Sequence, residues 1–356
     1  MKNLIKLEDL SSDCLWRIEK RETQWFAVNV RGEEYQTELN FTEDFNHTKQ
    51  ELHHGDVVEV TEKGKIQMLH DGSSSSALIY VTNQCNSNCI MCPDPEKVRT
   101  RANQITMEYL MEYISLLPSD LMHVDITGGE PTLLKYQLPL LIAETVAHTK
   151  DAEILMLSNG RSFADRTYAA EFAAFSAEKF KIEIPVHSAD PSRHDLIAGH
   201  PGSFRQTIAG IHHLLENGIE VGIRIVVSRL NYQELNSIIH LVHREFPRIR
   251  YINIMGMEVL GNAWKNRQTV WVEMDEVKPY VQKALEESFA CGIDPGLYNF
   301  PLCLFERKYW YCYRNSISGY KIRYFEVCEN CAERQKCGGF FFSTFHHTKY
   351  KVRVLP

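Results

Sequence analysis

The chain has 356 residues, of which 44% are hydrophobic and 24% charged, enough to bury a large core distributed over two or three domains. Its formal net charge is −7, and no basic stripe is interleaved with aromatic residues, which argues against a nucleic-acid-binding protein. No apolar stretch approaches the roughly 18 residues of a membrane-spanning helix, and the first residues lack a signal-peptide pattern. We therefore expect a cytoplasmic protein whose ten cysteines are reduced.

Residues 1–75 differ in kind from the rest of the chain. Two segments, 25–30 and 56–60, alternate apolar and polar residues, and Gly64 separates the second from the apolar residues 66–69. Alternation with a period of two indicates strands with one buried face, and a glycine between two such runs is typical of a hairpin. The sequence predicts a small N-terminal β-rich domain over residues 1–75.

The middle of the chain alternates short apolar segments with longer amphipathic ones. The predicted strands are rich in Ile, Leu or Val and span 77–81, 123–127, 153–157, 181–185, 220–227 and 251–255. Between them, Ser203 and the pair Asn231 and Glu234 are typical of helix N-caps. Six alternating units predict an α/β fold, a partial (β/α)6 TIM-type barrel over residues 76–290.

Three cysteines, Cys85, Cys89 and Cys92, follow the first predicted strand in the pattern C-x3-C-x2-C. Structural zinc takes four ligands, whereas a 4Fe-4S cluster held by three thiolates keeps one iron open for another ligand. A buried structural trio or half of a zinc site would explain the spacing alone. Neither explains its place at a strand end, where parallel barrels carry functional residues, or the Gly-Gly-Glu-Pro segment at 128–131 after the second strand.

A second group of cysteines lies further along the chain. Cys328, Cys331 and Cys337 are spaced C-x2-C-x5-C, and Cys303 precedes them. Four thiolates can close a metal site completely, so the sequence predicts either an iron-sulfur cluster or a zinc knuckle here. Cys312 is left over, as an alternative ligand, a buried thiol or a participant in catalysis.

The cysteine loop and the Gly-Gly-Glu-Pro segment together resemble the radical S-adenosylmethionine (radical SAM) enzymes. The resemblance implies that Cys85, Cys89 and Cys92 hold a 4Fe-4S cluster whose open iron chelates the methionine part of S-adenosyl-L-methionine. An electron from the cluster then cleaves the cofactor to a 5'-deoxyadenosyl radical, which abstracts hydrogen from the substrate. It also implies an electron donor such as flavodoxin or ferredoxin as a partner, whereas the composition argues against nucleic acid and a membrane as partners.

The same resemblance nominates residues that bind the cofactor. Met91 stands where many family members carry an aromatic residue near the adenine. Structural alternatives stay open: a plain turn at 158–160, a cap at 187–188, a rim salt bridge for Arg224 and a surface charge for Glu258. The cofactor candidates are Gly128, Gly129, Glu130, Pro131, Ser158, Asn159, His187, Ser188, Arg224, Met255 and Met91, and the catalytic candidates are Cys312 and Glu258.

More narrowly, the chain resembles the His-Xaa-Ser system radical SAM maturases, which act on ribosomally synthesised peptides. The stretches that carry this resemblance are 126–134, 255–263, 298–303, 316–318 and 328–340. It implies a precursor peptide as the substrate and a SPASM/twitch-like domain over residues 291–356. This domain would hold an auxiliary 4Fe-4S cluster on Cys303, Cys328, Cys331 and Cys337.

Other functions are compatible with these residues. The chain could mature a protein or a small redox cofactor instead of a peptide, or carry clusters without catalysing a reaction. The N-terminal domain has two interpretations as well. It is either a platform to which the leader of a precursor peptide adds a strand, or a lid that covers the open side of the barrel.

Overall fold

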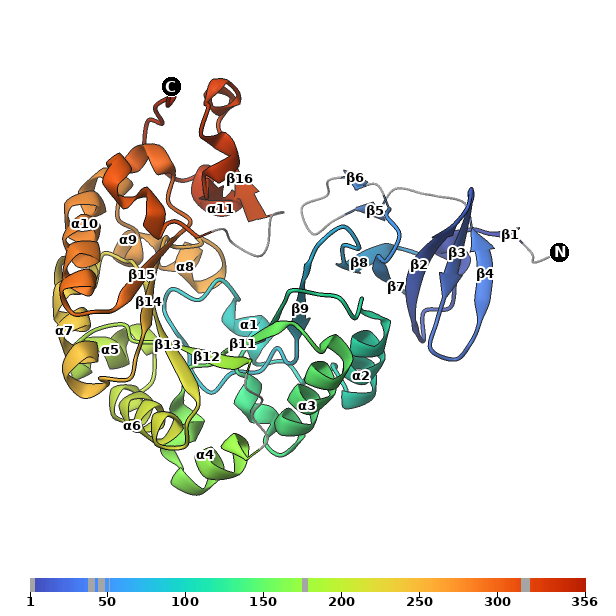
Figure 1. Cartoon of the computed structure of the whole chain (residues 1–356), viewed down its shortest axis with the longest axis horizontal. Coiled ribbons are helices and arrows are strands. Elements are labelled where there is room, and N and C mark those ends of the chain that lie inside the picture. Colours follow the sequence, from blue (N-terminus) through green and yellow to red (C-terminus); the bar gives the residue numbers. More distant parts are fainter. Residues whose placement is uncertain (1–3, 38–41, 44–48, 51, 175–178, 315–320) are drawn as a thin grey trace. The chain divides into compact units, whose positions relative to one another are not determined.

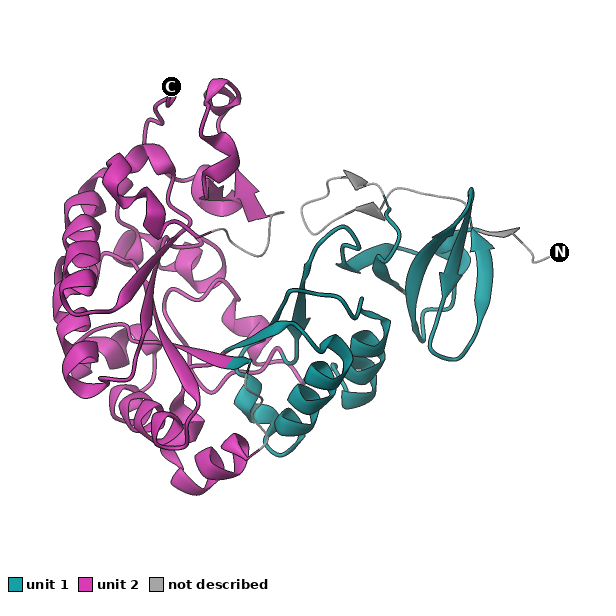
Figure 2. Ribbon diagram, in the orientation of Figure 1, with its two compact units in different colours: residues 1–82, 103–156, 175–180 teal, residues 83–102, 157–174, 181–356 magenta. Residues whose placement is uncertain are grey.

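The computed structural model describes residues 4–37, 42–43, 49–50, 52–174, 179–314 and 321–356 (Figure 1). The chain forms two compact units (Figure 2). Unit 1 comprises Met1–Thr82, Asn103–Met156 and Phe175–Phe180, and unit 2 comprises Asn83–Ala102, Leu157–Ala174 and Lys181–Pro356. The three-domain division at residues 75 and 290 stays a prediction, and the 316–318 stretch lies outside the described residues.

A six-stranded sheet forms the N-terminal part of unit 1. Its order is β1-β4-β3-β2-β7-β8, antiparallel except for the parallel pair β1 and β4. The strands are β1 (Leu4–Ile5), β2 (Leu15–Arg21), β3 (Gln24–Val28), β4 (Glu34–Thr37), β7 (Val57–Val60) and β8 (Ile66–His70), and a separate pair is β5 (Thr42–Glu43) and β6 (Lys49–Gln50). The predicted hairpin forms with Val60 opposite Ile66 and Gly64 at φ 71°. The β-rich prediction is confirmed.

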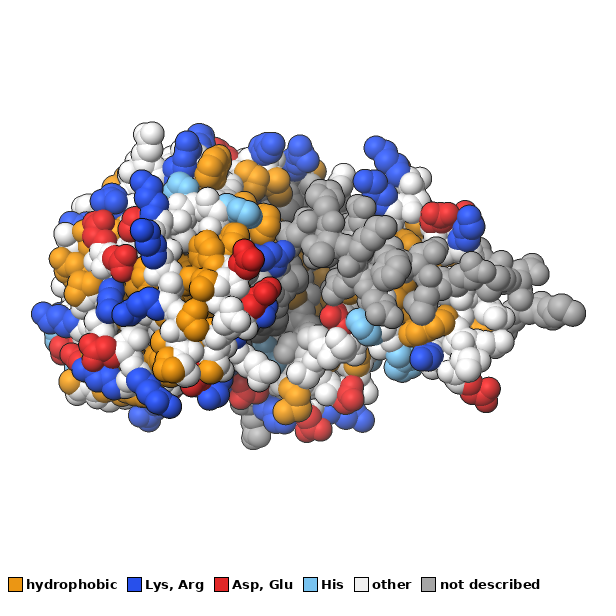
Figure 3. Space-filling model, turned by 90° about the horizontal axis from the view of Figure 1, so that it is seen from above, with side chains coloured by type: hydrophobic (Ala, Val, Ile, Leu, Met, Phe, Trp, Pro, Cys, Tyr) orange, Lys and Arg blue, Asp and Glu red, His pale blue; other side chains and the backbone are white. Residues whose placement is uncertain are grey.

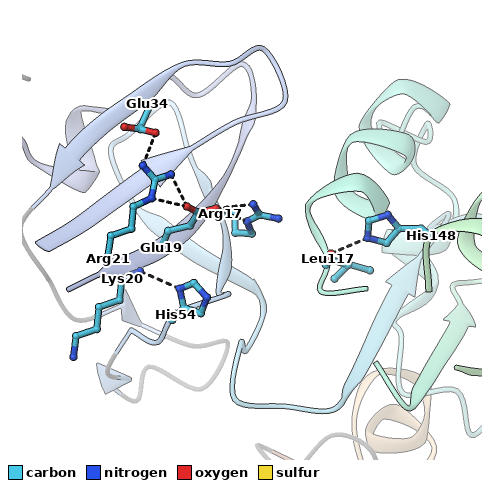
Figure 4. Close-up of polar contacts among 8 residues, drawn as sticks. All are labelled: Arg17, Glu19, Lys20, Arg21, Glu34, His54, Leu117 and His148. Carbon is cyan, nitrogen blue, oxygen red and sulfur yellow. Dashed lines mark hydrogen bonds and ion pairs between the residues drawn. The ribbon is translucent and has the colours of Figure 1, made fainter. Parts of the chain in front are cut away.

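The two faces of this sheet differ in chemistry, as a period of two requires. Trp16 and Ile18 of β2 are fully buried in an apolar cluster. Glu19, the next residue of the strand, forms ion pairs with Arg17 (2.6 Å) and Arg21 (2.6 Å) (Figure 4). Arg21 also forms an ion pair with Glu34 on β4 (2.8 Å). A buried apolar face and a paired charged face fix the register of the strand.

Seven parallel strands make up the second sheet, and their order in the sheet is their order in the chain. All six predicted segments form strands, which confirms the α/β class, and β15 is added at the edge beside β14. The sequence missed β15 because Asp294-Pro295-Gly296 is typical of a turn; an edge strand tolerates the proline. The strands are β9 (Ser76–Tyr80), β10 (His123–Thr127), β11 (Glu153–Leu157), β12 (Phe180–Pro185), β13 (Glu220–Val226), β14 (Tyr251–Met255) and β15 (Asp294–Tyr298).

Helices connect and follow these strands. The α-helices are α1 (Glu96–Arg99), α2 (Met107–Leu116), α3 (Gln137–Thr149), α4 (Arg166–Ala173), α5 (Pro191–Ala198), α6 (Ser203–Glu216), α7 (Leu235–Glu245), α8 (Gly261–Lys265), α9 (Arg267–Val270), α10 (Met274–Ala290) and α11 (Phe342–Phe345). The 3-10 turns are Leu7–Asp9, Pro131–Leu134, Arg161–Ala164, Tyr232–Glu234, Leu302–Leu304, Arg307–Cys312, Glu326–Asn330 and Arg334–Lys336. A small antiparallel pair, β16 (Ile322–Arg323) and β17 (Phe340–Phe341), lies in the C-terminal segment.

Two helix starts differ from the prediction. Gly202, at φ 77°, is the residue before α6, and Ser203 is its first helical residue. Asn231 and Glu234 form no capping box, because Asn231 accepts from the Ser228 amide (2.8 Å) and Glu234 accepts from the Ser188 hydroxyl (2.7 Å). Both side chains bind the segments after β13 and β12 instead of their own helix.

The surface agrees with the charge pattern of the sequence. On the face shown in Figure 3, basic and acidic side chains are interspersed and form no patch of one sign among the described residues. None of the described helices combines the length and the apolar composition that crossing a lipid bilayer requires.

Candidate metal centres

The cysteine loop, residues 83–102, follows β9 along the chain and belongs to unit 2. Its cysteines are free thiols, each partly exposed. Burial of the sulfur, together with the charges of Cys92 and Cys85, raises the pKa of Cys89 to about 12. Burial also raises the pKa of Cys92 to about 11. Because a metal cluster stabilises the thiolate form, three cysteines on one loop, two of them with thiol pKa values raised by burial, are a donor set that fits one.

The turn after β11 holds the first half of this loop. Asn159 donates to the side-chain oxygen of Asn86 (2.6 Å). Arg161, only 8% exposed, donates to the Asn86 carbonyl (2.5 Å) and to the Ser87 hydroxyl (2.8 Å). Ser158 accepts from the Gly160 amide (3.1 Å), which closes the turn. The predicted Ser-Asn-Gly turn therefore contacts the cysteine loop directly, and Arg161 is a second contact of this loop that the sequence analysis missed.

Helix α8 and the residue after it hold the second half. The buried Asn262 side chain donates to the Cys89 carbonyl (3.0 Å), and its backbone amide donates to the Cys92 carbonyl (2.9 Å). Asn266 donates to the carbonyl of Ile90 (2.9 Å). Main-chain positions around two of the three cysteines are thus fixed by amides that follow β14 by several residues. The sequence analysis pointed only to 255–258 in this region.

Met91 lies in an apolar cluster beside the cysteines. It is 6% exposed and packs with Ile197, Met257, Val259 and Ala263, among others. A polarizable, unbranched side chain in such a cluster offers an apolar surface of adaptable shape. That Met91 contacts the adenine stays a prediction.

The Gly-Gly-Glu-Pro segment follows β10 in unit 1. A Cβ atom at Gly128 would lie 2.5 Å from the carbonyl oxygen of Thr82, and the amide of Gly129 donates to that oxygen (2.6 Å). Glu130, 1% exposed, accepts from the amide (3.1 Å) and hydroxyl (2.7 Å) of Thr132. The glycines thus permit a close backbone approach, here to Thr82, two residues after β9, and the glutamate caps the 3-10 turn that Pro131 begins.

His187 and Ser188 follow β12 and are both buried. Burial, with His194 close by, lowers the pKa of His187 to about 3, so this imidazole is neutral. The His187 amide donates to His194 (3.2 Å), and among the described residues no partner faces the Nδ1 atom of His187. Ser188 donates to Glu234 (2.7 Å). His187 therefore keeps a ring nitrogen for a further ligand, whereas the serine hydroxyl binds protein.

Three polar side chains meet on adjacent strands. Arg224 of β13 forms an ion pair with Glu183 of β12 (3.1 Å), and Asn253 of β14 donates to the other oxygen of Glu183 (2.6 Å). Of the remaining candidates, Met255 ends β14 and Glu258 pairs with Lys321 (3.2 Å). Arg224 and Glu258 both form ion pairs within the protein. That Arg224 binds a cofactor carboxylate and that Glu258 takes part in catalysis stay predictions.

The four cysteines of the C-terminal group line one pocket. Cys303, Cys328, Cys331 and Cys337 all lie on its wall, although up to 34 positions separate them in the sequence. Burial raises the pKa of Cys337, and the charges of Cys303 and Cys328 raise it further. Cys312 does not line this pocket; it is fully buried, and burial raises its pKa to about 11.

Backbone amides point at the sulfurs of this pocket. Cys337 accepts from the amides of Leu302 (3.3 Å) and Gly339 (3.4 Å), and Cys331 accepts from the amide of Leu355 (3.4 Å). Such N–H···S bonds stabilise thiolates and are one of the factors that set the potential of iron-sulfur clusters. Four soft donors with these amides fit a 4Fe-4S cluster, and the donor set alone also suits zinc.

Comparison with known proteins identifies the domain around the cysteine loop. Residues 79–242 match the family model of the Radical SAM superfamily. GTP 3',8-cyclase of Petrotoga mobilis is 29% identical over 208 residues, covering 57% of this chain and 62% of that protein. Sporulation killing factor maturation protein SkfB of Bacillus subtilis is 25% identical over 204 residues, covering 54% of this chain and 47% of that protein. The chain thus spans less than two thirds of either relative.

Among solved structures, SuiB of Streptococcus suis bound to S-adenosylmethionine aligns with a TM-score of 0.52 and 14% identity, over 74% of this chain and 56% of that chain. At this identity the likeness is one of fold. The family match includes the C-x3-C-x2-C loop, and the parallel strands supply the expected scaffold. The chain therefore carries a domain of the radical SAM superfamily.

Proposed function

We propose that the protein is a radical SAM enzyme that abstracts hydrogen from a side chain of a ribosomally synthesised peptide. The observation that carries this proposal is the pocket of four cysteines, which lies outside the matched residues 79–242. SkfB is named a maturation protein, and SuiB has also been solved with its precursor peptide SuiA, with a TM-score of 0.51 to this chain. These similarities support a peptide as the substrate.

In this proposal Cys85, Cys89 and Cys92 hold the 4Fe-4S cluster that binds S-adenosyl-L-methionine and supplies the electron for its cleavage. Arg161 and Asn262 hold the backbone of the loop, because they bind the carbonyls of Asn86 and Cys89. Preorganisation of this kind removes the cost of ordering the loop when the cofactor binds. The buried, neutral His187 and the apolar surface at Met91 are proposed cofactor contacts. The other proposed contacts are Gly128, Gly129, Glu130, Pro131, Ser158, Asn159, Ser188, Arg224 and Met255.

The four C-terminal cysteines are proposed to hold an auxiliary 4Fe-4S cluster. Such a site could accept the electron that remains on the substrate after hydrogen abstraction, or serve as a structural site. The reduction potential of an iron-sulfur cluster depends on hydrogen bonds to its sulfurs and on its exposure to solvent. The backbone amides of Leu302, Gly339 and Leu355, which donate to Cys337 and Cys331, would therefore tune the potential of this cluster. Flavodoxin or ferredoxin is the proposed source of the electron that starts the reaction.

A second candidate function is the conversion of a small molecule. The cyclase from Petrotoga mobilis acts on GTP by its name, and it is more similar in sequence to this chain than SkfB is. Maturation of a protein or small redox cofactor belongs to the same alternative. These functions share the cysteine loop but differ in substrate, so only the substrate separates them.

Two substitutions test the roles of the cysteine groups. Cys89→Ala is expected to abolish release of 5'-deoxyadenosine, because the cofactor cluster loses a ligand. Cys331→Ala is expected to halve the iron, from about eight to about four atoms per chain, and to lose product while cofactor cleavage continues. Iron analysis and chromatography of anaerobically reconstituted enzyme measure both, with Cys291→Ser as the control that retains all activities. If Cys331→Ala formed as much product as the original enzyme, the auxiliary site would have only a structural role.

The substrate is tested by incubating the reconstituted enzyme with S-adenosyl-L-methionine, a reductant and a candidate peptide encoded near its gene. A mass change on a peptide side chain supports the proposal. GTP in place of the peptide is the parallel assay. Turnover of GTP, with no change to any peptide, would replace peptide maturation by the second candidate function.

A further inference from the structure

Arg99 is a buried cation that, among the described residues, binds only uncharged oxygens. It ends α1 within the cysteine loop and is only 6% exposed. Its guanidinium donates to the Ser87 carbonyl (2.6 Å), the Asn88 side-chain oxygen (2.6 Å) and the Asp94 carbonyl (3.2 Å). All three acceptors are uncharged. Among the described residues, no carboxylate lies within ion-pair distance of Arg99, in contrast to Arg224, which pairs with Glu183.

A buried charge without a counter-charge is costly, and hydrogen bonds to neutral oxygens compensate only part of the lost hydration. Asn88 directly precedes Cys89, and Asp94 follows Cys92 by two residues. The guanidinium is therefore bonded to the loop on both sides of these two cysteines. The carboxylate of Glu96 accepts a hydrogen bond from the Asn88 side-chain amide (3.2 Å) and forms no ion pair with Arg99 among the described residues. A negatively charged cluster held by this loop would lie beside a buried cation.

We propose that Arg99 is the counter-ion of the cluster on this loop and raises its reduction potential. The inference rests on the proposed function in that the three cysteines must hold a 4Fe-4S cluster. With three thiolates the site is net negative, and reduction by a low-potential one-electron donor adds one further negative charge, with no bond or proton exchanged. A buried cation that is already in place stabilises the reduced state more than the oxidised state.

The guanidinium also joins two parts of the loop. Its bonds connect Ser87 and Asn88, which precede Cys89, with Asp94, which follows Cys92. The planar guanidinium carries several N–H donors in a fixed geometry, which suits three acceptors. A lysine would keep the positive charge but not this arrangement of donors. Arg99 is thus a positioning residue as well as a counter-ion, and the two roles can be separated by substitution.

The test is a potentiometric titration of the reconstituted enzyme, followed by electron paramagnetic resonance. The cluster on this loop is recognised as the one whose signal changes when S-adenosyl-L-methionine is added. In Arg99→Met the equilibrium constant for its reduction is expected to fall at least tenfold, which equals 59 mV for a one-electron couple. In Arg99→Lys the potential is expected to stay near that of the original enzyme. Arg101→Met, which removes an exposed cation two residues away, is the control that leaves it unchanged.

An unchanged potential in an iron-loaded Arg99→Met enzyme would overturn the inference. An equal fall in Arg99→Lys and Arg99→Met would overturn it too, because the hydrogen bonds and not the charge would then set the potential. If Arg99→Met holds no cluster on the loop, the Arg99→Lys variant is the test of the inference. Loss of the cluster in both variants would show that Arg99 has a purely structural role and would overturn the inference. If the original enzyme holds no cofactor-responsive cluster at all, the proposed function itself fails.

Discussion

Single buried histidines make the stability of the fold depend on pH. His70, the last residue of β8, is 4% exposed, and burial lowers its pKa to about 4 from an ordinary value of 6.5. Burial lowers the pKa of His187 and of His194 in the same way. Each imidazole is neutral in the folded chain at pH values at which the unfolded chain already takes up a proton.

The sign of the effect follows from linkage. The stabilisation due to a neutral His70 is fully present above pH 6.5 and is lost as the pH falls to about 4, by about 3 kcal/mol in total. His70→Leu is expected to flatten this part of the pH dependence. Urea unfolding at several pH values, followed by the fluorescence of Trp16 and Trp25 in the same sheet, measures it. The exposed His54 gives the control His54→Leu, and identical slopes in both variants would contradict the assignment.

At the scale of elements, the cysteine loop depends on the start of α8. Gly261, its first residue, has a φ of 51°, and a Cβ atom there would lie 2.2 Å from the carbonyl oxygen of Pro93. Asn262 follows at once and donates to the Cys89 carbonyl. The close approach of helix and loop therefore requires a glycine, and the hydrogen bonds to the cysteine backbone depend on that approach.

Gly261→Ala is expected to destabilise the protein by about 1–3 kcal/mol from backbone strain alone, and to displace the loop through the clash. The expected result is loss of about four irons per chain while the auxiliary cluster remains, as seen by iron analysis and electron paramagnetic resonance. Gly292→Ala is the matched control, because its φ of 70° is also positive but its Cβ would meet no atom within 4 Å. Equal iron contents in the two variants would show that the contact with Pro93 is dispensable.

The sequence predicted those elements whose signal is local. Runs of Ile, Leu and Val predicted six strands, and cysteine spacing identified both candidate metal centres. It missed β15, because Pro295 and Gly296 are typical of a turn. It also missed the contacts of Arg161, Asn262 and Asn266 with the cysteine loop. An arginine or an asparagine is ordinary at a loop or a helix start. Its role becomes visible only when the fold brings it against a carbonyl of a distant loop.

On the scale of the whole molecule, two kinds of architecture share one chain. The sheets have long backbone ladders and apolar cores. The segment 302–356 has short 3-10 turns and a strand pair of two residues each, with Phe325 packed against Phe340 and Phe345. Since short turns and a two-residue strand pair are the regular elements in the described part of this segment, binding of a metal by its cysteines should supply a large share of its folding free energy.

Removal of iron is therefore expected to expose residues 324–337 to proteases while the N-terminal sheet stays protected. Limited proteolysis with mass analysis, with and without iron, measures this difference. Cys331→Ala should show the cleavage of the iron-free protein even when iron is supplied. A cleavage pattern that does not respond to iron would mean that aromatic packing alone maintains the segment.

The contact between Leu355 and Cys331 bears on how the protein is made. The donor to this sulfur lies 24 residues after it in the chain, and Arg353 and Tyr350 bind the carbonyl of Cys303 from the same stretch. During synthesis these bonds cannot form until that stretch has left the ribosome. In the proposed function, the C-terminal pocket can then be completed only after Leu355 has emerged, whereas the bonds that hold the loop at Cys85 need the chain only as far as Asn266.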